Sequence, residues 1–144
     1  MRASGSALSR AGLPMGRLAG LAGSALAAVL IAVPAAAEMP REFLGKWTSR
    51  PGICEQRNGE VDVLEVTSTE LSVYEIGCEL GRSERVAGGV RFAAQCYKGG
   101  SPASAGQVML RRLGQGRVEL ALLGFSWSSS DPQRFSRCPT GSAR

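Results

Sequence analysis

The stretch LSVYEIGCELGRSERVAGGVRFAAQCY, from Leu71 to Tyr97, decides the fold because it reads as a ribbon of strands joined by turns. In the segment that begins at Leu71, both faces of an extended chain carry apolar residues, so we expect cover on both sides. The Gly88-Gly89 pair supplies the positive φ angles that a tight hairpin turn needs. The stretch therefore predicts an antiparallel hairpin centred on these glycines.

The two cysteines of this stretch, Cys78 and Cys96, fall near the open ends of the hairpin arms. The two arms differ in length around the turn, so a direct pairing of the cysteines requires a β-bulge or a slightly shifted turn. Glycine commonly marks a bulge or bend in a strand, and Gly77 or Gly81 can provide one here. We also expect the chain to bend at Gly77, before Cys78.

The remaining chain adds further short strands to this ribbon. The clearest alternation lies in residues 117–123, where Val118, Leu120 and Leu122 face inward and Glu119 faces outward. The other expected strands are residues 43–48, 61–66, 107–113 and 133–138. Short strands with hairpin-length connections and no helical period predict an all-β fold. We expect a small antiparallel meander, closed or half closed into a barrel and stapled by two disulfides.

Residues 1–37 have the pattern of a cleaved secretory signal peptide, which leaves residues 38–144 as a single small β domain. Three arginines precede an apolar run, and small residues precede the polar Glu38. A start at Met15 would give a signal of more ordinary length. A transmembrane anchor is the alternative, but the run is short and rich in glycine. We therefore expect a periplasmic or secreted protein with no stable membrane anchor after cleavage.

Removal of this segment changes the charge of the protein. The chain has 17 basic and 12 acidic residues, and residues 1–37 contain three of the basic residues and none of the acidic ones. The mature chain therefore has 14 basic and 12 acidic residues, a net charge of +2. Much of the basic character belongs to the signal, so we expect no nucleic-acid partner.

The four cysteines, Cys54, Cys78, Cys96 and Cys138, all lie in the mature part. An even number in an exported chain indicates disulfides, and four cysteines allow three pairings. We favour Cys78–Cys96 across the central hairpin and Cys54–Cys138 between the first loop and the last strand. A zinc site is the competing interpretation, but the chain has no Cys-x-x-Cys pair and no histidine. We expect no metal and no other cofactor.

The sequence also resembles lipocalin-like barrels at its mature start, where Gly45-Lys46-Trp47 matches the Gly-x-Trp of their first strand. The later order of cysteines, with Tyr74-Glu75 before Cys78, is similar to small exported β-proteins of Gram-negative bacteria. The resemblance implies that Gly45 and Trp47 are structural, with Trp47 plugging one end of a barrel. The domain is close in size to periplasmic inhibitor barrels, which block proteases or lysozyme. It departs from them in having two cysteine pairs and only a loose Ser-Gly-rich segment, residues 100–106.

The residue types argue against an enzyme. Histidine, the commonest general base, is absent, and paired cysteines leave no thiolate nucleophile. Glu60, Asp62 and Glu65 are close in sequence, but in a strand Glu65 points away from the other two. The serines around Trp127 have no neighbouring base. An enzyme built on distant carboxylates remains an alternative.

Trp127 and three arginines are the candidate binding residues. Trp127 lies in a serine-rich loop and is either an exposed anchor or packed under the barrel rim. Arg82, Arg85 and Arg91 flank the Gly88-Gly89 turn and form either a basic face for an acidic partner or a solvated ribbon. We therefore expect an exported binding module for an unidentified protein, with inhibition of a lytic enzyme as one form. A small-ligand carrier is the alternative.

Overall fold

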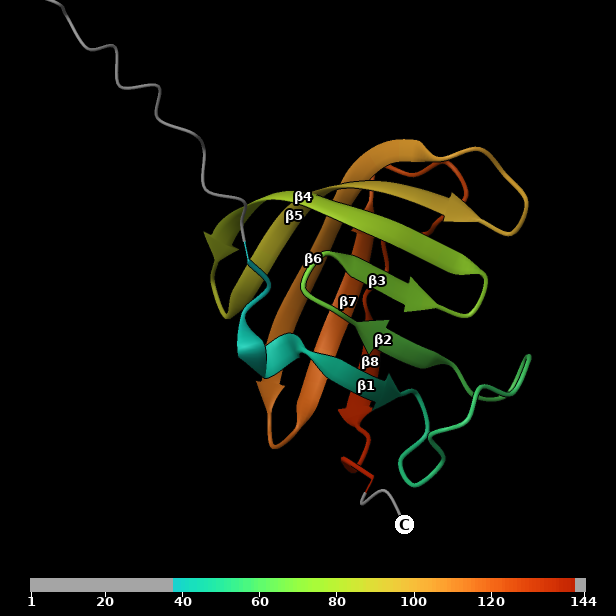
Figure 1. The fold of residues 1–144 in the computed structure, drawn as a ribbon, viewed down its shortest axis with the longest axis vertical. Helices are drawn as coiled ribbons and strands as arrows, with labels where there is room; N and C mark the ends of the chain where they lie inside the picture. The colour runs from blue at the N-terminus through green and yellow to red at the C-terminus, as the bar shows by residue number, and fades with distance from the viewer. Residues whose placement is uncertain (1–37, 142–144) are drawn as a thin grey trace, which may run out of the picture. The chain divides into compact units, whose positions relative to one another are not determined.

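The computed structural model describes residues 38–141, which form an antiparallel β-barrel of eight strands preceded by one turn of 3₁₀ helix (Figure 1). The predicted all-β meander is confirmed, and the barrel is closed rather than half closed. No helix within this part of the chain is long and apolar enough to cross a membrane. The predicted signal peptide and the alternative start at Met15 lie outside the described residues. The elements are η1 (Arg41–Phe43), β1 (Gly45–Thr48), β2 (Val63–Val66), β3 (Glu70–Val73), β4 (Ile76–Val86), β5 (Gly89–Lys98), β6 (Ser104–Gly114), β7 (Arg117–Leu123) and β8 (Gln133–Arg137).

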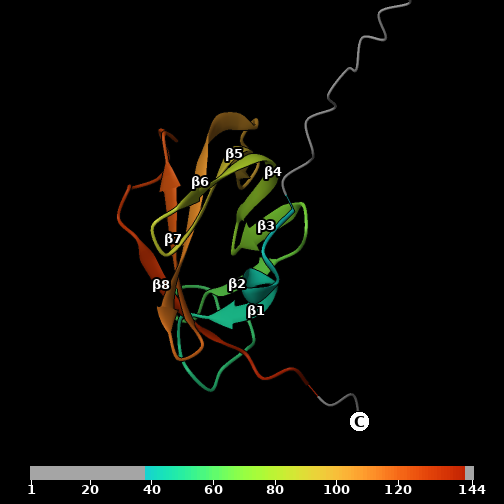
Figure 2. The same cartoon turned by 90° about the vertical axis from the view of Figure 1, so that its left-hand side faces the viewer.

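Each strand pairs with the next one, and β8 returns to pair with β1. This seam is short, because it consists of the pairs Trp47–Arg137 and Thr48–Ser136. In Figures 1 and 2, strands β1 to β4 form one wall of the barrel and β6 to β8 form the opposite wall. Closure removes the exposed sheet edges that an open meander would present.

The central ribbon consists of β3, β4 and β5, with its first turn earlier than the sequence predicted. The chain reverses at Tyr74-Glu75, where Tyr74 has a φ of 50°, and not at Gly77. Gly77 lies within β4, directly opposite Tyr97 of β5. A Cβ atom on Gly77 would lie 2.4 Å from the Tyr97 Oη atom, so the absence of a side chain at Gly77 lets the Tyr97 ring lie across β4 in this position.

The predicted disulfides, Cys54–Cys138 and Cys78–Cys96, are both confirmed. Cys78 lies directly opposite Cys96, with a Cα–Cα distance of 4.1 Å. The bulge that this register requires lies between Leu80 and Ser83 and includes Gly81, one of the two glycines expected to provide it. The second disulfide joins the β1–β2 loop to the residue that follows β8.

Inward-facing side chains from all the strands fill the barrel. Leu64, Phe92, Leu110 and Leu120 are almost completely inaccessible to solvent. The alternation predicted for residues 117–123 is confirmed, because Val118, Leu120 and Leu122 are buried, whereas Glu119 lies on the outer face within 3.6 Å of Arg134. A packed interior of this kind is expected for a small eight-stranded barrel.

The turn η1 lies beside the start of β1 and contributes Phe43 to the core. Trp47 is 2% exposed, and its indole Nε1 donates a hydrogen bond to the Phe43 carbonyl at 2.9 Å. Gly45 has a φ of +111°, which residues with side chains rarely adopt. These contacts place Gly45 and Trp47 where the chain passes from η1 into the first strand.

Candidate functional site

The structure separates the three arginines that flank the central hairpin. Arg85 is paired with the buried Val90, so it continues the inward-facing row of β4 at the end of the barrel. Arg91 is paired with Glu84 on the outer face, with 3.9 Å between its Nη1 and the Glu84 Oε2. Arg82 is exposed within the bulge. The three side chains therefore do not share one basic face.

Trp127 lies in the β7–β8 loop, partly buried against the hydrophobic core. Its ring stacks on Phe125, with 4.9 Å between the ring centroids. The indole Nε1 is inaccessible and has no hydrogen-bond partner among the described residues. This geometry packs Trp127 at the rim of the barrel.

A hollow of about 310 Å³ lies on the outer wall formed by β2, β3, β4 and β5, and we call it the acidic hollow. Its lining includes the exposed carboxylates of Glu65, Glu70 and Glu79. Glu70 and Glu79 are directly opposite each other on β3 and β4, an arrangement of like charges that destabilises a sheet. Glu65 has a partner in Lys46, at 3.9 Å. The hollow therefore concentrates negative charge at some cost in stability.

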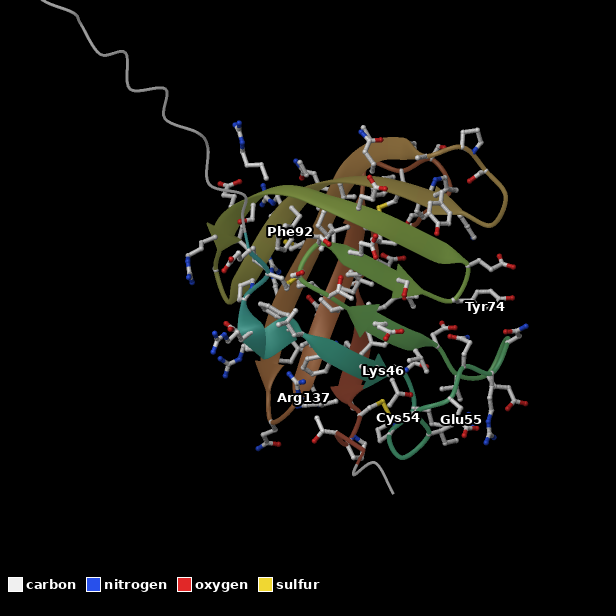
Figure 3. The ribbon with its side chains drawn as sticks, viewed as in Figure 1. Lys46, Cys54, Glu55, Tyr74, Phe92 and Arg137 are labelled. Atoms are coloured by element: carbon white, nitrogen blue, oxygen red, sulfur yellow. A yellow bond between two sulfur atoms is a disulfide. The ribbon has the colours of Figure 1, made fainter. Side chains whose placement is uncertain are left out.

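Two tyrosines at the same end of β4 are the exposed large hydrophobic residues of the described chain, each 48% exposed. Tyr97 lies across Gly77 and borders the acidic hollow. Tyr74 projects from the β3–β4 turn away from the barrel (Figure 3). Its positive φ is unusual for a bulky residue, and such strain is typical of positions kept for function.

A second hollow, of about 530 Å³, lies at the opposite end of β4, between η1 and the barrel, and we call it the arginine hollow. Arg85 and Arg112 line it from β4 and β6, and Glu38 and Glu42 line it from the N-terminal segment. Gly88, Gly89 and Gly114 contribute the turn backbone at its edge.

Arg112 and Tyr97 are site residues that sequence reasoning missed. The sequence does contain a pattern that identifies Arg112. It is an alternate residue to Val108 and Leu110, so in a regular strand all three side chains face the same, inward side. The signal for Tyr97 was its position opposite a strand glycine, which becomes visible only when the hairpin register is known.

No family model, curated protein or solved structure matches the chain. Within residues 38–141, no three side chains of histidine, cysteine, aspartate or glutamate are grouped to hold a metal ion. The two disulfides indicate an oxidising environment. A functional proposal therefore depends on the chemistry of the two hollows and the tyrosines beside them.

Proposed function

We propose that the protein is an exported binding module, periplasmic or secreted, that holds a basic protein partner at the acidic hollow. Tyr74 and Tyr97 would contact the apolar part of the partner surface. The observation that carries this proposal is the position of Tyr97, exposed beside Glu70 and Glu79 on the outer wall. Tyrosine is enriched at interfaces because its rigid ring covers a large area and its hydroxyl group bonds to polar groups.

The filled interior supports an outward-facing binding role over the carrier alternative. A carrier needs an apolar cavity large enough to enclose its ligand. In this barrel, Trp47, Phe92 and Leu110 occupy the space that a ligand would need. Recognition by the outer wall requires no such space, because the partner remains outside.

Charge complementarity supports a basic partner. The lining of the acidic hollow has three carboxylates and no lysine or arginine. Exposed Glu70 and Glu79 repel each other in the free protein, and a lysine or arginine of the partner placed between them would relieve that repulsion. Complementary charges also raise the rate of association and exclude wrong partners.

The enzyme alternative would use the same carboxylates. A carboxylate pair in acid–base catalysis needs two different environments, so that one group holds a proton while the other is ionised. Glu70 and Glu79 are both exposed to water, and neither has an apolar pocket around it. The arrangement therefore favours binding over catalysis.

Inhibition of a basic lytic enzyme, a lysozyme or a protease, is the specific form of binding that we propose. A rigid barrel stapled by two disulfides survives in a hydrolytic environment, and an exposed, strained Tyr74 is suited to enter a cleft. The resemblance of the chain to periplasmic inhibitor barrels supports the same form.

The test compares the wild-type protein with the double variant Glu70→Lys/Glu79→Lys as bait in extracts of exported proteins. We expect the wild type to retain a basic protein that is released by salt, and the charge-reversed variant to lose it. The control is Glu55→Lys/Glu60→Lys, which makes the same charge change in the β1–β2 loop, outside the hollow. A partner retained equally by both double variants would contradict the proposal.

Tyr74 offers a second test that separates binding from folding. Asparagine tolerates a positive φ, so Tyr74→Asn should keep the melting temperature and weaken binding at least tenfold. Purified lysozymes and proteases should then be assayed for loss of activity with the wild type and with this variant. Equal inhibition by both proteins would remove Tyr74 from the contact surface.

A further inference from the structure

The arginine hollow is independent of the surface proposed above, because it lies at the opposite end of β4 and shares no lining residue with the acidic hollow. Two arginines line it, Arg85 and Arg112, and each lies at the end of a row of inward-facing side chains on its strand. Arg85 is paired with the buried Val90, and Arg112 is paired with the buried Val118. Both arginines therefore stand on the core side of their strands, at the point where the core ends and solvent begins.

The turn between β4 and β5 brings these two strands close to β6. The Arg112 amide donates a hydrogen bond to the Gly88 carbonyl at 2.9 Å, which fixes the turn against β6. A Cβ atom on Gly89 would lie 1.9 Å from the Leu110 carbonyl oxygen, so this approach is possible only for glycine. The backbone thus holds Arg85 and Arg112 at one hollow by a rigid turn.

Neither guanidinium group forms an ion pair within the described residues. The three ion pairs of this part of the chain use Lys46, Arg91 and Arg134. Glu38 and Glu42 line the same hollow but come from the N-terminal segment on its other side, and neither forms an ion pair with the arginines. Arginine presents several donors in a planar fork that fits carboxylate and phosphate groups.

The excess of positive charge comes from the surroundings, because two arginines and two glutamates line the arginine hollow itself. A smaller hollow of about 250 Å³ adjoins the first one and shares Glu42, Arg112 and Gly114 with it. Arg117 and Arg137 line this second hollow. Together the two hollows contain four arginines and two glutamates, a net charge of +2. Clefts lined by one excess charge concentrate ions of the opposite sign.

We propose that the arginine hollow is a binding site for a small organic anion, whose carboxylate or phosphate group bonds to Arg85 and Arg112. The volume of about 530 Å³ is within the usual range for small-ligand sites, roughly 300–1,000 Å³. Gly88 and Gly114 have no atom within 4 Å of an added Cβ, so they leave the edge of the hollow open for the rest of the ligand. Glu42 also lines the hollow, and its carboxylate would favour ligands that carry a hydrogen-bond donor.

The test follows backbone amide resonances of the oxidised protein during titration with inorganic phosphate and, separately, with succinate, at constant ionic strength. We expect saturable shifts at Gly88, Gly89 and Gly114 with at least one of the two anions. The anion that binds more tightly identifies the phosphate or carboxylate class. Shifts that sodium chloride reproduces at the same ionic strength would overturn the proposal.

The variants Arg85→Gln and Arg112→Gln should each weaken binding at least fivefold, with the remaining resonances unchanged as evidence of an intact fold. The matched control is Arg82→Gln, which removes the same charge from the neighbouring bulge, outside the hollow. Arg85→Lys should bind the anion more tightly than Arg85→Gln but less tightly than the wild type, because lysine keeps the charge and loses the planar fork of donors. If Arg82→Gln weakened anion binding equally, the binding would reflect general charge attraction, and the proposed site would be overturned.

Discussion

The guanidinium carbon of Arg137 lies 3.9 Å from the centroid of the Trp47 ring, across the seam where β8 meets β1. The same guanidinium group donates to the Leu44 carbonyl at 3.0 Å and to the Glu42 carbonyl at 2.5 Å. One side chain from the last strand therefore covers the tryptophan of the first strand and holds the segment that precedes it. These interactions reinforce the β1–β8 seam, which has only two pairs of facing residues.

Replacement of Arg137 by methionine should lower the free energy of unfolding by about 2–4 kcal/mol, because it removes two charge-assisted hydrogen bonds and the cation–π contact. Denaturant melts of the oxidised protein measure this change. Arg134→Met is the matched control, since Arg134 is exposed on the same strand and its ion pair with Glu119 contributes little. An equal loss in both variants would contradict a special role for Arg137.

Trp47→Ala should cost about 3–5 kcal/mol, the usual range for removal of a buried large aromatic residue. The side chain is 2% exposed and its indole group is hydrogen bonded. Trp127 is partly buried, so Trp127→Ala should cost less and leave a folded protein. Thermal melts of both variants test this order, and a wild-type melt for Trp47→Ala would show that the two roles are reversed.

Removal of the Cys54–Cys138 disulfide by Cys54→Ala/Cys138→Ala should lower stability by roughly 4–5 kcal/mol in the chain-entropy model. The sequence separation of 84 residues makes the loop long, so the cross-link restricts the unfolded chain strongly. Denaturant melts measure the loss, and non-reducing peptide mapping checks the pairing. A linked peptide containing Cys54 and Cys78 would contradict the observed connectivity.

Gly89→Ala should destabilise the protein by about 3 kcal/mol, because the added methyl group meets the backbone of Leu110 and Arg111, which cannot move aside cheaply. Gly88→Ala provides the control. Its φ is +74°, but nothing lies within 4 Å of the added atom, so only conformational strain of about 1 kcal/mol is expected. Melts that rank the two variants in the opposite order would reject close packing at Gly89.

The exported protein should begin at Glu38, because the first abrupt change from apolar to polar residues follows Ala37. Intact mass spectrometry of protein recovered after export measures the processed mass. Retention of residues before Ala35 would contradict the predicted cleavage.

Local patterns in the sequence were sufficient to predict the strands and the Cys78–Cys96 disulfide. The central hairpin places Cys78 and Cys96 on facing strands, and alternation in residues 117–123 identifies the buried face. Its turn is Ala87-Gly88 and not the predicted Gly88-Gly89 pair, because Gly89 pairs with Val86 as the first residue of β5, and of the two glycines only Gly88 has a positive φ. These features depend on neighbouring residues or on a single hairpin, so the chain specifies them without reference to distant segments. The exception is the β3–β4 turn, where Tyr74 adopts a conformation that its residue type disfavours.

Only the tertiary structure decided which charged residues meet. The bulge between Leu80 and Ser83 changes the phase of β4, so the inner and outer positions of Arg82 and Arg85 cannot be read from alternation. Closure of the barrel brings Arg137 to Trp47, although the two residues are far apart in the sequence. The pairing of β5 with both β4 and β6 places Arg85 and Arg112 at the same hollow. Register, bulges and closure are set by packing of the whole barrel, and the two hollows exist only once that packing is complete.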